Sequence, residues 1–465
     1  MTERTGMPNM WGRLTAGLVL GLLMIARPLV AVAQDVPVVH DDLPAVVAQS
    51  APAALPDEAE PASAIDAGDT AWMLASSALV LLMTPGLAFF YGGLVRSKNV
   101  LNTMMMSFIS LGAVGILWAL FGYSLAFGEG SAFVGDGTAF FLRGVGLEPG
   151  GLATIPGYLF VAFQGTFAII TAALISGAIV ERMRFPAYLL FISLWTLIVY
   201  SPLAHMVWGG GWLAQMGALD FAGGTVVHIN AAVAAAVAVI CVGKRTDYRQ
   251  AGLLPHNVPF VLLGAGLLWF GWFGFNAGSA GAANGIAGLG FATTMFAPAA
   301  TVVVWAFLDL LRVGKVTAVG LATAIVVGLV AITPAAGLIS PMNAIILGGI
   351  AAVPSYMMLL WRARSGFDDS LDVLAAHGLG GTVGALLTGV FADEALNGVG
   401  SGLLYGNPGQ LVTQVVAVVA AIVYSGVLSF VLLKLVGLVT PLRVETEAEN
   451  FGLDPTQHGE EGYVH

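Results

Sequence analysis

The chain has 465 residues, of which 58% are hydrophobic and only 9% are charged. Soluble domains carry about 25% charged residues, so this chain lacks the polar surface that a soluble protein needs. The net charge of -10 says little about partners, because residues 34–69 hold eight acidic side chains and no Lys or Arg. The composition therefore indicates a polytopic membrane protein.

The first 33 residues are typical of a secretory signal peptide. Arg4 and Arg13 precede an apolar run, and Ala31-Val32-Ala33 gives a small-residue cleavage pattern. Arg27 interrupts the apolar run, which leaves an additional, uncleaved helix as the alternative. Residues 34–69 are rich in Ala, Pro and Asp without periodicity, and they predict a disordered acidic periplasmic tail.

Residues 70–441 form the expected membrane domain. They contain eleven apolar runs near or above the roughly 20 residues that span a bilayer. The runs cover residues 70–94, 101–127, 157–180, 186–207, 222–243, 256–279, 286–311, 316–335, 338–361, 371–391 and 410–440. The predicted fold class is an all-α polytopic membrane protein with eleven transmembrane helices.

Positive charges are distributed unevenly between the loops. Loops after even-numbered runs hold only Arg143. Loops after odd-numbered runs hold Arg96, Lys98, Arg182, Arg184, Lys244, Arg245, Arg249, Arg312, Lys315, Arg362 and Arg364. Because cytoplasmic loops are enriched in Lys and Arg, the mature N-terminus is expected outside and residues 442–465 form a cytoplasmic C-terminal tail. A cleaved signal peptide predicts the same topology.

Two runs share a polar pattern that indicates an internal symmetry. Asp220 precedes His228 by eight residues at the start of run 5, and Asp369 precedes His377 by eight at the start of run 10. An offset of five runs makes the two halves opposite in orientation, which predicts an inverted 5+5 repeat plus a final helix. At about 1.5 Å per residue, each histidine lies on the order of 10 Å deep, from opposite faces.

Ionisable residues inside a membrane are functional candidates by default. His228 and His377 could meet in one pathway through the middle of the bilayer. The alternative for each is a neutral imidazole that bridges two packed helices. Asp220 and Asp369 also have a structural alternative, since Asp is a favoured N-cap. A path lined only by imidazoles lacks the carboxylates of typical Na⁺ or divalent-metal sites.

Aromatic residues lie near the outer ends of three runs. Phe163 and Phe167 are four apart in run 3, Trp208 ends run 4, and Phe275 and Ser279 are four apart in run 6. Each is explained singly by packing or by an interfacial aromatic belt. Together they are candidates for a cage that holds a compact cation by cation–π attraction.

Enzyme and metal signatures are absent from the sequence. It contains no HExxH and no GxSxG motif, which argues against an intramembrane metalloprotease or serine hydrolase. The single cysteine, Cys241, excludes an intramolecular disulfide and argues against a cysteine metal site. No cofactor, no metal and no nucleic-acid partner is expected, and the chain is not expected to be an enzyme.

Several long motifs resemble those of the ammonium transporter family (Amt, Mep and Rhesus proteins), and of its bacterial Amt branch in particular. They are PGLAFFYGGLVRSKNVLN, GYSLAFGEG, VAFQGTFA, AHMVWGGGWL, GALDFAGGTVVHINAA, WFGFNAGSAG and AAHGLGG. The similarity runs from about residue 69 to the C-terminal GLDPTQHGEEGY. It implies eleven membrane helices, the inverted repeat, and a homotrimer with one pore in each subunit. A cytosolic PII-type regulator is a common partner in the family.

The resemblance also implies roles for the outer residues. Phe163, Trp208 and Ser279 match a site that recruits ammonium, where the ring faces attract the cation and the serine accepts a hydrogen bond. Asp220 matches the aspartate beside that site.

Deeper residues match the pore of the family. Phe167 and Phe275 match a stacked phenyl gate, and His228 and His377 match the paired imidazoles of the hydrophobic pore. Thr166 stands where the family pattern has serine, which is a conservative difference.

These observations lead to the hypothesis of an ammonium transporter in the cell inner membrane, with methylammonium as an analogue substrate. Ammonium would lose a proton on entering the dry pore, because desolvating an unpaired cation costs several kcal/mol or more. One alternative is an ammonium sensor with little flux, for which the segment after Arg443 is short for an output domain. Another is a pure NH3 channel without a cation step, against which Trp208 and Ser279 argue.

Overall fold

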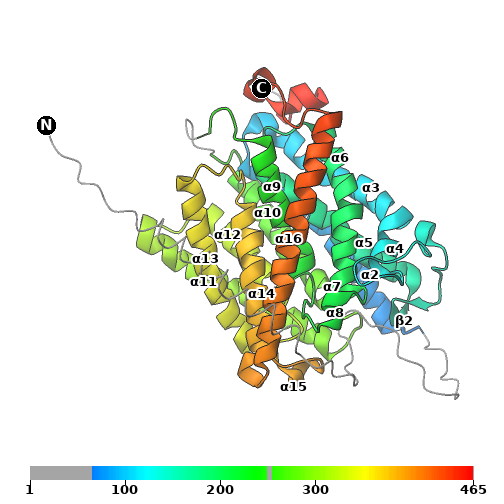
Figure 1. Ribbon diagram of the computed structural model, residues 1–465. Coiled ribbons are helices and arrows are strands. Elements are labelled where there is room, and N and C mark those ends of the chain that lie inside the picture. The colour runs from blue at the N-terminus through cyan, green and yellow to red at the C-terminus, as the bar shows by residue number, and fades with distance from the viewer. Residues whose placement is uncertain (1–64, 249–253, 464–465) are drawn as a thin grey trace, which may run out of the picture. The chain divides into compact units, whose positions relative to one another are not determined.

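The computed structural model describes residues 65–248 and 254–463, which form a bundle of long helices (Figure 1). The expected signal peptide (1–33) and most of the expected acidic tail (34–64) lie outside the described residues.

Ten helical segments within the described ranges are long and apolar enough to cross a membrane. Their helices are α2 (Ala67–Leu94), α3 (Val100–Leu117) with α4 (Tyr123–Phe127), α5 (Gly157–Leu174), α6 (Phe185–Trp195) with α7 (Ser201–Trp208) and α8 (Trp212–Gln215), α9 (Asn230–Val242), α10 (Val258–Gly278), α11 (Gly285–Val313), α13 (Pro341–Arg364), α14 (Gly380–Phe391) and α16 (Pro408–Val439). The expected run 316–335 holds a shorter apolar helix, α12 (Ala318–Ile332). The predicted helical, multi-pass character is confirmed.

Short elements complete the described chain. π-Helical turns occur at Trp118–Gly122 (η2), Thr196–Tyr200 (η5), Gly224–Ile229 (η6), Leu374–Leu379 (η7) and Asp454–His458 (η9). Tighter 3₁₀ turns occur at Ser97–Asn99 (η1), Phe140–Leu142 (η3), Ile175–Ala178 (η4) and Leu403–Tyr405 (η8). Two short α-helices, α15 (Glu394–Asn397) and α17 (Thr446–Phe451), flank α16.

Two details differ from the sequence-based expectation. An antiparallel hairpin of β1 (Pro149–Gly150) and β2 (Leu152–Pro156) interrupts the otherwise all-α chain, with Gly151 at φ +77° in its turn. Helix α2 begins at Ala67, so the last three residues of the expected tail are helical. The helix starts there because the Asp66 side chain accepts the Asp69 N–H at 2.8 Å and caps it.

Small residues bring helices of the bundle into close contact. A methyl group on Gly264 of α10 would lie 2.3 Å from the backbone nitrogen of Phe90 in α2. A methyl group on Gly93 of α2 would lie 2.6 Å from the carbonyl oxygen of Asn257. Without a hydrophobic driving force between helices in lipid, such backbone approaches supply much of the packing.

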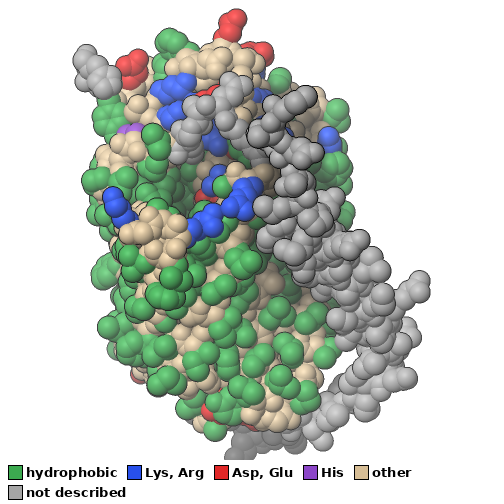
Figure 2. Space-filling view, turned by 90° about the vertical axis from the view of Figure 1, so that its left-hand side faces the viewer, with side chains coloured by type: hydrophobic (Ala, Val, Ile, Leu, Met, Phe, Trp, Pro, Cys, Tyr) green, Lys and Arg blue, Asp and Glu red, His purple; other side chains and the backbone are tan. Residues whose placement is uncertain are grey.

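The bundle has two distinct ends in Figure 1. We call the end with α17 and the C-terminal residues the tail end, and the end with the hairpin, α8 and α15 the hairpin end. Figure 2 shows hydrophobic side chains over most of one face, with Lys and Arg gathered toward the tail end. Exposed apolar side chains such as Val303 (68%) and Leu438 (84%) fit a surface covered by lipid.

Candidate functional site

The two intramembrane histidines meet inside the bundle. His228 lies in η6 and His377 in η7, each at the start of a membrane helix, and their Nδ1 atoms are 3.2 Å apart. Helix α9 continues from His228 to the tail end, and α14 continues from His377 to the hairpin end (Figure 1). The two segments therefore approach the pair from opposite sides, which is the arrangement that their spacing in the sequence predicted.

Each histidine segment is started by a capping aspartate. The Asp220 carboxylate accepts the backbone N–H groups of Gly223, Gly224, Thr225 and Val226, and also the Thr225 hydroxyl. The Asp369 carboxylate accepts the N–H groups of Val373 and Leu374. Both aspartates thus satisfy helix-terminal donors that have no partner within the helix.

Asp220 also connects its helix to a neighbouring aromatic residue. The Trp208 indole N–H donates to the carbonyl oxygen of Asp220 at 2.8 Å. One residue therefore positions both the segment that carries His228 and the ring of Trp208. The Asp369 side chain lies at the tail end, where burial and the neighbouring charge of Asp372 raise its pKa to about 6.

Aromatic rings continue from the histidine pair toward the hairpin end. Phe275 lies 6.1 Å from the His228 ring, and Phe167 stacks on Phe275 with centroids 4.2 Å apart. Trp208 meets Phe167 edge-on at 6.1 Å. We call Trp208, Phe167, Phe275, His228 and His377 the ring file. All five are buried, with exposed fractions of 4% or less, so the file is shielded from bulk solvent and presents aromatic faces along its length.

Phe163 and Ser279 flank the Trp208 end of the ring file. Phe163 packs on Phe167 at 4.9 Å. The Ser279 hydroxyl donates to the carbonyl oxygen of Phe275 at 2.8 Å, so its proton points at that backbone oxygen. The lone pairs of its oxygen remain able to accept a hydrogen bond from a solute. Every sequence-predicted site residue therefore lies in or beside the file.

The chemistry at the histidine pair follows from one short contact. Because the two Nδ1 atoms face each other, one must donate and the other must accept, so two neutral rings have opposite tautomers. Nε2 of His228 is buried and has no protein partner among the described residues. A cavity of about 10 Å³ beside the rings is lined by ten apolar side chains and the two histidines. This volume fits one water-sized solute that can hydrogen-bond to an imidazole.

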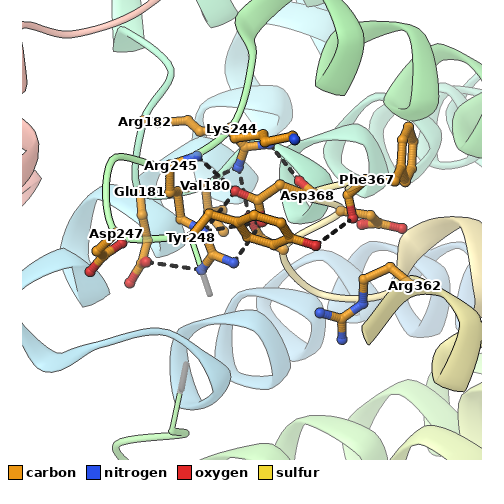
Figure 3. A network of polar contacts seen from close by, with 12 residues as sticks. Val180, Glu181, Arg182, Lys244, Arg245, Asp247, Tyr248, Arg362, Phe367 and Asp368 are labelled. Atoms are coloured by element: carbon orange, nitrogen blue, oxygen red, sulfur yellow. Dashed lines mark hydrogen bonds and ion pairs between the residues drawn. The ribbon is translucent and has the colours of Figure 1, made fainter. Parts of the chain in front are cut away.

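An ion-pair network lies at the tail end, and Figure 3 shows it from close by. Glu181 accepts hydrogen bonds from Arg96 and Arg245, and Arg245 also pairs with Asp368 at 2.7 Å. Burial alone would raise the pKa of Glu181, but the hydrogen bonds and charge of Arg96 lower it. For Asp368, burial is likewise outweighed by Arg245 and the charge of Arg182, and its pKa is lowered.

Arg182 joins the two histidine segments at this end. Its guanidinium donates to the carbonyl oxygens of Gly243, just after α9, and Asp368, just before η7, at 2.7 and 2.6 Å. It also donates to the Ser370 hydroxyl at 2.7 Å. Burial lowers the pKa of Arg182 to about 10. Arg96, Arg182 and Arg245, which the charge pattern of the loops placed on one side of the membrane, therefore also hold neighbouring segments together through hydrogen bonds.

Trp272 is a site residue that sequence reasoning did not single out. Its indole stacks on His228 with centroids 5.4 Å apart, and its N–H donates to the Thr333 hydroxyl at 2.9 Å. The available signal was its position three residues before Phe275, which places both rings on one helical face. No group of three or more metal-ligating side chains occurs in residues 65–248 and 254–463.

Comparisons with known proteins identify similar sequences and similar folds. The Ammonium Transporter Family profile matches residues 71–463. An ammonium transporter of Bacillus subtilis is 49% identical over 399 residues, covering 85% of this chain and 98% of the relative. The crystal structure of Candida albicans Mep2 superposes with a TM-score of 0.78 at 33% identity, covering 82% of this chain and 87% of that one. A solved structure described as a sensor Amt protein has a TM-score of 0.78 at 29% identity, covering 84% and 98% of the two chains.

Proposed function

The chain belongs to the ammonium transporter family, and from this premise we propose that it carries ammonium through the ring file. The observation that supports the path most directly is the 3.2 Å contact between His228 and His377 inside an otherwise apolar lining. This pair supplies the polar groups that a small solute needs halfway across a membrane.

In this proposal, ammonium first binds at the Trp208 end of the ring file. The faces of Trp208 and Phe163 attract a compact cation, and this attraction contributes about 0.5–2 kcal/mol. The Ser279 oxygen accepts one of its N–H bonds, because the serine proton is already donated to Phe275. Asp220 acts through position, since its carbonyl oxygen holds the Trp208 indole.

Phe167 and Phe275 form the gate between this site and the histidines. Their rings stack at 4.2 Å, so one ring must rotate before a solute passes. A bare cation loses its hydration there without gaining a charged partner, which costs several kcal/mol or more. The proposal is that the proton leaves at this point and that NH3 continues along the imidazoles, whose ring nitrogens are candidates for relaying the proton.

The wider arrangement in the cell is also a proposal. It has eleven spans with α12 as the shortest, an inverted 5+5 repeat, an outer N-terminus and a cytoplasmic C-terminal tail in the cell inner membrane. The Lys and Arg side chains gathered at the tail end support this orientation. The resemblance to the family implies a homotrimer and a cytosolic PII-type regulator. The signal peptide over residues 1–33 rests on the apolar run and the Ala31-Val32-Ala33 pattern, and the exposed apolar side chains favour surrounding membrane lipid.

The direct test is uptake of radiolabelled methylammonium into proteoliposomes that contain the purified protein. The proposal predicts saturable uptake that unlabelled ammonium competes away. Uptake equal to that of protein-free liposomes would favour the sensor alternative, for which the likeness to a sensor Amt structure is the specific observation. Currents on a solid-supported membrane separate the remaining alternative, because a pure NH3 channel produces none when ammonium is added.

A further inference from the structure

Asp69 lies near the outer site without touching its rings. It occupies the first turn of α2 at the hairpin end, and both of its carboxylate oxygens are bonded. Oδ2 accepts the Thr154 hydroxyl at 2.6 Å, and Oδ1 accepts the Ala283 N–H at 2.7 Å.

The two partners of Asp69 belong to the segments that carry the outer-site residues. Thr154 lies in β2, which leads directly into α5 and Phe163. Ala283 lies in the loop that follows α10 and includes Ser279. Asp69 is therefore a bridge between the supports of Phe163 and Ser279, which must keep a fixed spacing to hold one small cation.

Neighbouring contacts tie the same three segments together. The Asp66 N–H donates to the carbonyl oxygen of Thr154 at 2.9 Å, and the Trp72 indole N–H donates to that of Ala277 at 3.3 Å. A methyl group on Gly278, next to Ser279, would lie 3.0 Å from the Phe163 ring. At this distance a small shift of the loop changes the space available between Phe163 and Ser279.

We propose that Asp69 is a positioning residue that sets the affinity of the outer site for ammonium by fixing the distance between Phe163 and Ser279. This inference rests on the proposed function of that site. The role requires the two hydrogen bonds rather than the negative charge. In the described part of the chain no ion pair includes Asp69, so its hydrogen bonds are the contacts through which it acts.

A hydrogen-bonding role and a purely electrostatic role of Asp69 predict different effects of substitutions on the affinity of the outer site. In Asp69→Asn the amide oxygen still accepts from Ala283, and the amide NH2 donates to the Thr154 oxygen. In Asp69→Ala both bonds are lost. Glu148→Ala removes a negative charge from the exposed residue that precedes β1 while both Asp69 bonds stay, so it is the matched control.

The test measures the concentration dependence of methylammonium uptake in proteoliposomes. We expect Asp69→Ala to raise the half-saturating concentration about fivefold, which corresponds to a loss of about 1 kcal/mol in binding free energy, with a maximal rate within about twofold of wild type. Asp69→Asn and Glu148→Ala should stay near the wild-type value. An unchanged half-saturating concentration in Asp69→Ala, or an equal rise of this concentration in Asp69→Asn and Asp69→Ala, would overturn the proposal.

Hydrogen–deuterium exchange on the same variants gives a readout that does not depend on transport. Asp69→Ala, but not Asp69→Asn, should speed amide exchange in residues 149–156 and 279–284 while α9 is unaffected. If wild-type protein shows no saturable uptake, the proposed function fails, and unchanged exchange in Asp69→Ala overturns the positioning role separately. Thr154→Val removes one of the two bonds and should give a smaller change of the same sign if Asp69→Ala does not fold.

Discussion

At the scale of single residues, Asp220 carries much of the local structure around the histidine pair. Its carboxylate accepts four backbone N–H groups and one hydroxyl, and its carbonyl oxygen accepts the Trp208 indole N–H. Its counterpart Asp369 accepts only two N–H groups. The two aspartates have the same spacing to their histidines, but Asp220 accepts more hydrogen bonds than Asp369.

Asp220→Ala should therefore destabilise the protein more than Asp369→Ala. Removing the Asp220 carboxylate leaves four buried N–H groups without their acceptor, at a cost on the order of 3 kcal/mol or more. Thermal unfolding in detergent measures the difference, with Asp369→Ala as the matched control. Equal melting temperatures for the two variants would show that the extra bonds of Asp220 contribute nothing.

The residues of the site were predictable to the extent that spacing reports on them. The eight-residue separation of aspartate and histidine indicated both members of the pair, and the four-residue spacings indicated Phe163, Phe167 and Ser279. Trp272 was not singled out, because its stacking on His228 joins two helices whose relative rotation the sequence does not specify. The bridge made by Asp69 was not predictable either, because Thr154 and Ala283 are far from Asp69 along the chain.

At the scale of elements, each histidine lies in a π-helical turn rather than in regular α-helix. Such turns are rare in proteins as a whole, but those that occur lie disproportionately at functional sites. Hydropathy predicted the runs that contain them, but it could not predict the extra residue in the turn. The hairpin β1–β2 was also missed, because a two-residue strand leaves no alternation to detect.

The tail-end network makes a prediction at the scale of elements. Glu181 is fully buried and pairs with Arg96 and Arg245. In Glu181→Ala, Arg96 keeps Asp247 and Arg245 keeps Asp368, so the change should cost about 1.5–3 kcal/mol, the scale of lost hydrogen bonds to charged groups. Thermal unfolding is the measurement. The control is Glu445→Ala, which breaks an exposed pair with Arg184 and should leave the melting temperature near that of wild type. A similar small effect for both variants would contradict the role of the network.

At the scale of the whole molecule, the fold was predictable because apolar length is a strong constraint in lipid. All eleven expected runs are helical, and ten reach the length and apolarity of a membrane span. The eleventh, α12, has 15 residues and is buried over most of its length. Packing within the bundle, rather than hydropathy, explains how so short a helix is retained.

The proposed orientation can be tested by labelling introduced cysteines. In a Cys241→Ser background, Ala395→Cys lies at the hairpin end and Lys315→Cys in the loop between α11 and α12; both positions are exposed. A membrane-impermeant maleimide added to intact cells should label the first and not the second, because the hairpin end faces outward. The reverse pattern would invert the topology and place the Trp208 end of the ring file inside the cell.

Methylammonium uptake by a His228→Ala, His377→Ala double variant tests the central claim most directly. His256→Ala is the control, because His256 bonds to Val95 and Tyr463 away from the ring file. If ammonium passes between the paired imidazoles, uptake by the double variant falls to the level of protein-free liposomes, while wild type and His256→Ala show saturable uptake. Wild-type uptake by a folded double variant would contradict the account.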